Sequence, residues 1–372
     1  MGISFYIFQS AGYVIDVYRG DTDAEKNFFN YALFIAFFPK LVSGPIERSK
    51  DFLKQIREIS NTAFFNLKRL SEGCILMIWG YFLKMVIADR AAILVNTVFD
   101  NYYMYGSVEL CAAAVGFALQ IYCDFASYST IAAGAAKILG FSLMENFNTP
   151  YFATGIKDFW RRWHISLSTW LRDYVYISLG GNRQGKARKA FNLFVTFAVS
   201  GIWHGANWTY IVWGAMHGFY QIISDYTLSF RNKIKRICKV KTDCFSYTLF
   251  QRLATFLMVD AAWIVFRSDS ISDAVQYFRR IFTMPTPWML FNGGLFTLGL
   301  NRVEMNILLI SVLLLFLVDL VRMKQQLTID AFLLRQNLWF TWIAMIGLIC
   351  FIFIYGTYGP AFDSQSFIYF QF

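Results

Sequence analysis

The chain has 372 residues, of which 57% are hydrophobic, 19% are aromatic and only 16% are charged. This excludes an ordinary water-soluble domain, in which about a quarter of the residues are charged. The formal net charge of +10 would suit a nucleic-acid-binding protein, but the basic residues lie in loops beside apolar blocks and no nucleic-acid motif appears. The composition predicts a protein of the lipid bilayer that binds no nucleic acid.

Apolar blocks recur along the whole chain. About 20 apolar residues cross the ~30 Å hydrocarbon core as a helix, and uninterrupted apolar runs favour a helical bundle over a β-barrel. We therefore predict an all-α, polytopic transmembrane bundle. Its spans are expected at residues 2–18, 28–43, 70–99 (long enough to contain a break), 108–136, 191–203, 207–226, 248–266, 305–321 and 337–355.

Basic residues indicate the orientation of this bundle. The predicted loops at 44–69, 137–190, 227–247 (with Arg252) and 322–336 hold 25 of the 34 Lys and Arg residues, and the loops on the opposite side hold six. Loops rich in Lys and Arg remain in the cytoplasm. The pattern predicts a multi-pass protein of the cell (cytoplasmic or inner) membrane with these four loops inside.

The amino terminus has neither a basic n-region nor a small-residue cleavage site, so we do not expect a removable signal peptide. Its apolar residues look instead like the middle of a span. We therefore expect one membrane-embedded domain over residues 1–372 that lacks upstream spans.

The segment around residues 157–180 is too polar to span the membrane. It carries Trp160, Trp163 and Trp170 among arginines, and tryptophan prefers the membrane interface. We predict an interfacial or re-entrant amphipathic segment here.

A break in a second segment makes His204 the first catalytic candidate. The apolar stretch at 190–223 is too long for one span and is interrupted around Gly201 and Gly205. Non-helical backbone at membrane depth requires surrounding protein or a cavity, so we expect a cavity at His204, with both glycines leaving room for a substrate. His217, farther along the next helix, is interpreted as structural.

His164 is the second candidate. Ser168 follows it by four residues, which would place both on one face of a helix. The two could form a proton-handling pair or a substrate clamp, or they could be an interfacial histidine and a serine that solvates its helix. The sequence leaves these alternatives open.

Polar residues near these histidines are candidates for substrate binding: Arg161, Arg162, Asn182 and Arg183. Arginine suits phosphate, so they could hold the phosphates of a coenzyme A donor. Positive-inside anchoring to lipid is the plainer interpretation, and Asp158 with Arg162 is expected to form an ion pair. The cysteines and histidines show no zinc-ligand spacing, so no metal site is expected.

Glycine-rich and aromatic motifs occur from one end of the chain to the other, at residues 2–9, 13–19, 38–45, 158–174, 177–183, 200–205, 213–218 and 367–372. In order and spacing they resemble the membrane-bound O-acyltransferases, and specifically their bacterial alginate O-acetyltransferase branch. Proteins of that branch carry further spans before the motif that opens here at Gly2.

The resemblance implies a function. In that family the histidine matching His204 is catalytic, and the one matching His164 is a second functional residue lining the same tunnel. The implied donor is acyl-CoA, here acetyl-CoA, with no tightly bound cofactor, and the acceptor is a hydroxyl of an extracellular polysaccharide such as alginate or a wall polymer. A secreted or periplasmic partner protein would complete the transfer. The alternatives are D-alanyl transfer to teichoic acid and a non-catalytic polymer transporter or scaffold.

Overall fold

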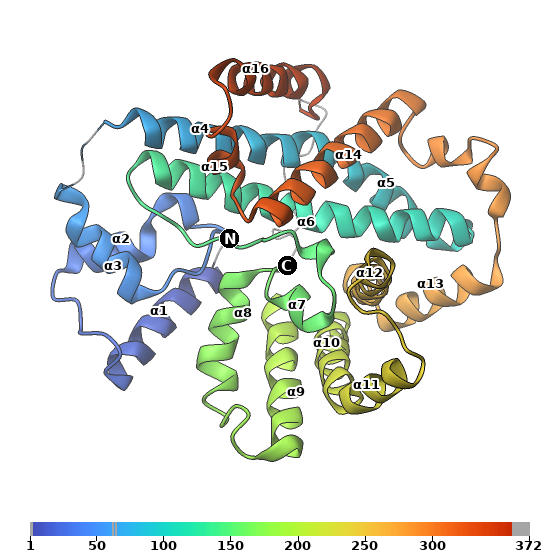
Figure 1. Ribbon diagram of the computed structural model, residues 1–372, viewed down its shortest axis with the longest axis horizontal. Helices are drawn as coiled ribbons and strands as arrows, with labels where there is room; N and C mark the ends of the chain where they lie inside the picture. Colours follow the sequence, from blue (N-terminus) through green and yellow to red (C-terminus); the bar gives the residue numbers. More distant parts are fainter. Residues whose placement is uncertain (1–2, 62, 64, 359–372) are drawn as a thin grey trace. The chain divides into compact units, whose positions relative to one another are not determined.

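The computed structural model describes residues 3–61, 63 and 65–358, and its regular elements in these ranges are all helices (Figure 1). The predicted motifs at Gly2 and at 367–372 lie outside them. The first eight helices are α1 (Ile3–Arg19), α2 (Phe28–Ala36), α3 (Ser49–Glu58), α4 (Leu67–Phe82), α5 (Asp89–Phe99), α6 (Ser107–Ile138), α7 (Ile156–Trp160) and α8 (Ile165–Leu171). The others are α9 (Gly185–His204), α10 (Trp208–Tyr226), α11 (Leu228–Ile237), α12 (Phe245–Arg267), α13 (Ile271–Thr283), α14 (Arg302–Gln325), α15 (Ile329–Leu333) and α16 (Leu338–Tyr355).

The chain divides into two compact units. Unit 1 comprises residues 1–94, 119–148 and 299–372, and unit 2 comprises residues 95–118 and 149–298. Each unit is built from segments that are distant in the sequence. All three histidines of the chain belong to unit 2.

Five helical stretches among the described residues are long and apolar enough to cross a membrane. They are Leu67–Phe99, Ser107–Ile138, Phe245–Arg267, Arg302–Gln325 and Leu338–Tyr355. They match five of the nine predicted spans, and the predicted polytopic helical fold is confirmed. The break suspected within the first stretch is a π-helical segment, Leu83–Ala88, through which the helix continues.

The other four predicted spans form helices that are too short or too polar to be counted among the stretches that could cross a membrane. The helix α1 has 17 residues. The predicted span at 28–43 is wrong as one helix, because α2 ends at Ala36 and Pro39 opens a separate 3₁₀ turn. The helices α9 and α10 have 20 and 19 residues but include polar side chains such as Lys189 and Gln221.

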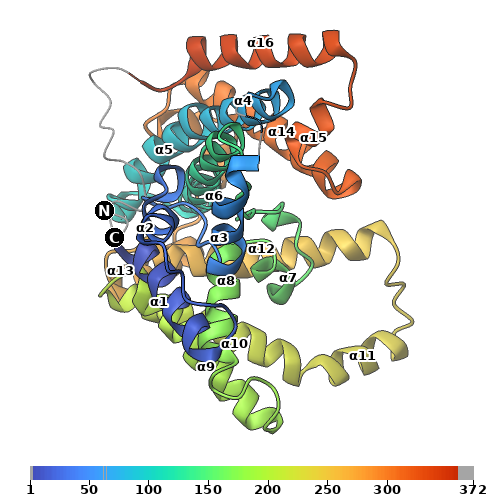
Figure 2. The ribbon, with the colours of Figure 1, turned by 90° about the vertical axis from the view of Figure 1, so that its left-hand side faces the viewer.

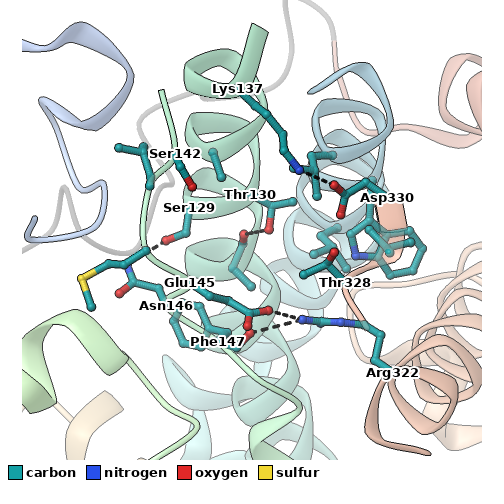
Figure 3. Close-up of a pocket in the computed structure, with 18 of the residues that line it drawn as sticks. Ser129, Thr130, Lys137, Ser142, Glu145, Asn146, Phe147, Arg322, Thr328 and Asp330 are labelled. Carbon is teal, nitrogen blue, oxygen red and sulfur yellow. Dashed lines mark hydrogen bonds and ion pairs between the residues drawn. The ribbon is translucent and has the colours of Figure 1, made fainter. Parts of the chain in front are cut away.

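Unit 1 contains a small cavity of about 210 Å³ with two basic side chains on its wall (Figure 3). The ammonium of Lys137 lies 2.5 Å from a carboxylate oxygen of Asp330 and 3.2 Å from one of Glu72. Such contacts between opposite charges compensate the desolvation of burial.

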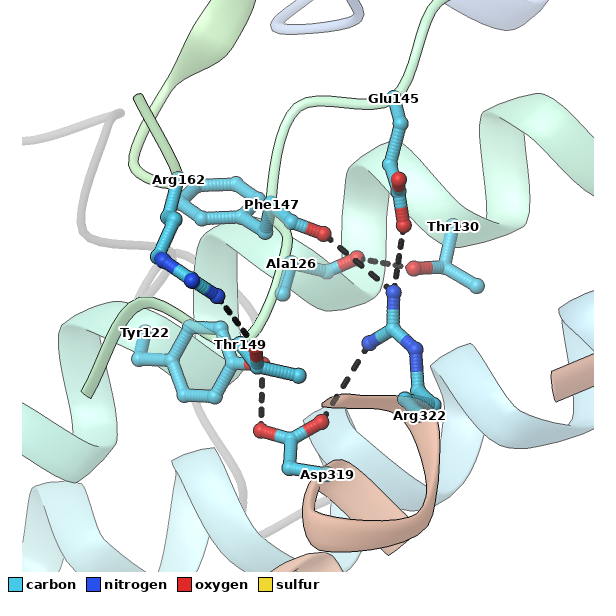
Figure 4. Close-up of polar contacts among 9 residues, drawn as sticks. All are labelled: Tyr122, Ala126, Thr130, Glu145, Phe147, Thr149, Arg162, Asp319 and Arg322. Atoms are coloured by element: carbon cyan, nitrogen blue, oxygen red, sulfur yellow. Dashed lines mark hydrogen bonds and ion pairs between the residues drawn. The ribbon is translucent and has the colours of Figure 1, made fainter. Parts of the chain in front are cut away.

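The second basic side chain, Arg322, lies between two carboxylates (Figure 4). It pairs with Glu145 and, at 3.3 Å, with Asp319. The hydroxyl of Tyr122 donates a 2.9 Å hydrogen bond to the other oxygen of Asp319. The network therefore joins α6, α14 and the segment that follows α6.

Unit 2 is organised around two neighbouring helices, α9 and α10, which lie side by side (Figure 1). The helix α10 also packs against α12, and the short helix α7 contacts both α10 and α12. These contacts bring residues 156–160, 204–217 and 259–266 into one core.

Candidate active site

Two glycines allow α9 and α10 to approach closely. A Cβ atom on Gly201 would lie 2.3 Å from the carbonyl oxygen of Tyr210, and one on Gly214 would lie 2.3 Å from that of Phe197. No larger residue fits at either position without separating the helices. The contact fixes the end of α9, where His204 lies.

The turn after His204 is formed by Gly205 and is held by hydrogen bonds of Asn207. Gly205 has a φ of 152°, and Asn207 caps α10 by accepting a 3.1 Å hydrogen bond from the backbone N–H of Thr209. The Asn207 amide also donates to the carbonyl of Asp269 at 3.0 Å. The predicted break between two helices is thus confirmed.

The role predicted for the two flanking glycines is wrong. A Cβ on Gly205 would lie 2.9 Å from the ring of Tyr210, and Gly201 faces the backbone of that same residue. Both glycines therefore make room for α10 and not for a substrate. The predicted cavity at His204 stays a prediction.

Aromatic rings surround the imidazole of His204, which is 6% exposed. Ring centroids close to it lie at 4.9 Å (Trp203), 5.1 Å (Trp213), 5.3 Å (Phe266) and 6.4 Å (Tyr210). Trp213 and Phe266 present near-perpendicular planes, at 90° and 84°. His204 thus lies among aromatic rings that belong to α9, α10 and α12.

His217 occupies the same core and is fully buried. Its Nδ1 accepts a 3.2 Å hydrogen bond from the indole N–H of Trp160, and its ring centroid lies 5.1 Å from that of Trp213. Trp213 therefore lies against both His204 and His217. The bond to Trp160 ties α7 to α10, which is a structural contact of the kind predicted for His217.

His164 is 1% exposed and lies in the turn before α8, in the left-handed region at φ 42°. Its ring centroid is 6.0 Å from that of Trp203, the neighbour of His204 in the chain. This turn is outside the membrane-spanning stretches. Burial lowers the pKa of His164 well below its ordinary value, and the nearby His204 lowers it further. The structure thus brings the two predicted catalytic histidines into one neighbourhood.

The predicted amphipathic segment around 157–180 is not one continuous helix. It consists of α7, a turn at residues 161–164, α8, and a π-helical turn at Arg172–Tyr176. Ser168 stands four residues after His164, but its hydroxyl donates a 3.1 Å hydrogen bond to the carbonyl of Trp163. That bond fits the alternative of a serine that solvates its own helix.

The predicted phosphate-binding residues lie on two separate turns. Arg162 forms the expected ion pair with Asp158 at 2.9 Å and donates to the hydroxyl of Thr149 at 3.1 Å (Figure 4), whereas Arg161 is exposed. Asn182 and Arg183 are exposed in the turn before α9. Arg162 therefore positions its own turn, and phosphate binding by the four residues stays a prediction.

The sequence did not reveal the contribution of α12. Trp263 stacks on Trp213 with centroids 5.6 Å apart, and Phe266 contacts His204. Trp263 and Phe266 are three positions apart, which is compatible with one face of α12. The sequence of an apolar helix, however, does not show which face is buried. Within the described part of the chain no group of three or more His, Cys, Asp or Glu side chains could hold a metal ion.

A family model supplies the classification. The model of the MBOAT, or membrane-bound O-acyltransferase, family matches residues 22–266, which include all three histidines. The chain belongs to this family. Together with the five apolar helices, membership makes it a multi-pass membrane protein.

Known relatives within the family carry several names. The probable alginate O-acetylase AlgI of Pseudomonas putida is 42% identical over 284 residues, which are 76% of this chain and 55% of that protein. The peptidoglycan O-acetyltransferase of Helicobacter pylori is 32% identical over 75% of this chain and 56% of that protein. The teichoic acid D-alanyltransferase of Bacillus subtilis is 30% identical over 63% of this chain and 61% of that protein. The chain thus spans little more than half the length of these relatives.

Proposed function

We propose that this protein transfers an acyl group, most simply acetyl, from a cytoplasmic acyl-CoA toward hydroxyls of an extracellular polysaccharide. The observation that carries the proposal is His204 at the break between α9 and α10, held by aromatic rings beside His164. Family membership and the alginate and peptidoglycan O-acetyltransferases among the relatives support it.

In the proposed reaction His204 acts as a general base. Its imidazole takes the proton from the attacking hydroxyl, the oxygen forms a bond to the thioester carbonyl carbon, and the carbon–sulfur bond breaks. The proton then passes to the departing thiolate. A neutral imidazole is the form that can accept a proton, and the neighbouring rings bear no charge that would hold it protonated.

His164 has a supporting part in this proposal. Its low pKa keeps it neutral at physiological pH, so it can orient a substrate or accept a hydrogen bond without adding charge beside His204. A secreted or periplasmic partner would receive the acyl group and complete its transfer to the polymer. The protein would act from the cytoplasmic, or inner, membrane.

D-alanyl transfer to teichoic acid is the second candidate, because a D-alanyltransferase is among the relatives. Its 30% identity to this chain, against 42% for the alginate O-acetylase, favours the acetyl group. A polymer transporter or scaffold would need no base at His204.

The test measures O-acetyl groups on the extracellular polysaccharide of cells that carry the native protein, His204→Ala, Ile202→Ala or no protein. Ile202 lies on α9 two residues away and is exposed, so it serves as the matched control. We expect His204→Ala to reach the membrane at native levels while acetylation falls to that of cells without the protein. Unchanged acetylation in His204→Ala would overturn the proposal, and a loss of polymer D-alanine instead would establish the second candidate.

A further inference from the structure

Unit 2 contains a cavity of about 700 Å³ that the proposed chemistry does not use. It lies between α10, α11, α12 and residues 154–156, and none of the three histidines lines it. In Figure 2, α11 follows α10 and α12 returns above it through the loop at the right. Because a water molecule occupies about 30 Å³ in the liquid, the cavity is far larger than a few structural waters require.

Two basic side chains of α11 face this cavity. Arg231 and Lys235 are four residues apart, which places them on one face of the helix, and both line the cavity. Arg231 is held by 2.7 Å and 3.1 Å hydrogen bonds to the carbonyl and hydroxyl of Ser224. The ammonium of Lys235 lies 5.3 Å from the ring centroid of Tyr247. Within the described ranges neither cation pairs with a carboxylate, so their charge is available to an anion.

The rest of the cavity is mainly apolar and follows the two longer helices. The apolar side chains on its wall include Ile223 of α10 and Phe250, Ala254 and Met258 of α12. From Tyr247 to Met258 the helix rises about 16 Å, which is about half of the ~30 Å hydrocarbon core. The two cations thus lie at the entrance of an apolar groove whose length is about the thickness of one leaflet of the membrane.

The outer face of α11 also suits a membrane surface. Phe230 and Ile237 are seven residues apart on one side of the helix, and they are 65% and 67% exposed. A short helix with exposed apolar side chains on one side and Lys and Arg on the other is typical of interfacial amphipathic helices. The sequence places this helix in a loop on the cytoplasmic side, where anionic lipids concentrate.

We propose that the cavity between α10, α11 and α12 binds one anionic phospholipid. Its phosphate lies between Arg231 and Lys235, and one acyl chain runs along α12 toward Met258. The two cations favour an anionic headgroup by charge complementarity. The apolar groove behind them favours a lipid over a free phosphate compound. The site is independent of the proposed acyl transfer.

The test uses native mass spectrometry of the full chain in detergent. Phosphatidylglycerol and phosphatidylcholine with identical acyl chains are titrated against the wild type and two double variants. The variant Arg231→Gln/Lys235→Gln removes both cations from the cavity. The matched control, Lys233→Gln/Arg236→Gln, removes two charges from the same helix at positions that do not line the cavity.

We expect the wild type and the control to prefer phosphatidylglycerol, and the cavity variant to bind it about thirtyfold more weakly, since each of the two cations near an anionic lipid contributes about 1 kcal/mol. Equal weakening in both double variants, or equal binding of the two lipids by the wild type, would overturn the proposal.

A third variant tests the groove. Ala254→Trp leaves both cations in place and fills the apolar part of the cavity. We expect it to lose phosphatidylglycerol as well. Native binding by this variant, or displacement of the lipid from the wild type by inorganic phosphate or coenzyme A, would show that the occupant is a free phosphate compound.

Discussion

Unit 1 and unit 2 both bury polar side chains, but they do so in opposite ways. In unit 1 the partly buried basic groups Lys137 and Arg322 each contact two carboxylates. In unit 2 the buried imidazoles of His164 and His204 lie among aromatic rings. Full charges in a low-dielectric interior need opposite charges beside them, whereas a neutral imidazole does not. The first arrangement stabilises a fold, and the second suits the proton acceptor that the proposed reaction requires.

The largest effect is expected from breaking the charged network of unit 1. Arg322→Ala leaves Asp319 and Glu145 without their shared cation, so the free energy of unfolding should fall by about 3–5 kcal/mol. Lys324→Ala, on the same helix at an exposed position, should stay within about 0.5 kcal/mol of the wild type. Chemical unfolding of the purified protein in detergent measures both. Equal effects of the two variants would refute a structural role for the network.

The packing that positions His204 can be disturbed without touching a polar group. In Gly201→Ala the new methyl group collides with the carbonyl of Tyr210, so α10 must move away from α9. We expect a loss of about 1–3 kcal/mol in unfolding free energy, typical of overpacking, and a lower acyl-transfer rate. Gly347→Ala is the control, since nothing lies within 4 Å of its added atom. A native rate in Gly201→Ala would show that the helix contact does not position His204.

The neutral burial of His164 has a consequence for acid stability. Below about pH 6.5 the unfolded chain binds a proton at this residue and the folded chain does not, because the folded pKa is lowered. The free energy of unfolding therefore falls as the pH falls below about 6.5, by up to about 1.4 kcal/mol per pH unit.

In His164→Gln the free energy of unfolding should fall less steeply below about pH 6.5. Above pH 7 the substitution should not change how the free energy of unfolding depends on pH. Unfolding midpoints between pH 5 and pH 8 measure the slope. An identical slope in the variant would mean that His164 is protonated in the folded protein.

The smallest effect on stability is expected at the exposed turn before α9. Arg183→Gln should change the free energy of unfolding by less than about 0.5 kcal/mol. If the turn holds donor phosphates, the apparent KM for acetyl-CoA rises about fivefold with kcat unchanged, as for the loss of one cation. Arg188→Gln, exposed at the start of α9, is the control. An unchanged KM in Arg183→Gln would leave lipid anchoring as the role of this residue.

Much of the fold was predictable from the sequence because lipid imposes a simple rule of length and apolarity. The spans at 70–99, 108–136, 248–266, 305–321 and 337–355 were found within a few residues of the observed helices. The prediction at 28–43 was wrong because a proline within an apolar run ends a helix without changing the hydropathy of the run. The segment at 157–180 was predicted as interfacial or re-entrant, and its division into α7, a turn, α8 and a π-helical turn had no counterpart in the sequence pattern.

The candidate site was partly predictable. With only three histidines and one glycine-flanked break, the sequence pointed to His204 directly. It assigned Gly201 and Gly205 to a substrate, whereas they face α10, because a sequence does not show what lies opposite a glycine. The pairing of His217 with Trp160 joins residues 57 positions apart and left no local signal.

The sequence by itself determined the membrane environment, the helical class, the family resemblance and the identity of the two leading histidines, because composition, periodicity and motif order are properties of the chain. The tertiary structure decided which rings enclose His204, which helix each glycine faces, and which cations of α11 face a cavity. These depend on contacts between residues far apart in the sequence, and only packing of the helices specifies them.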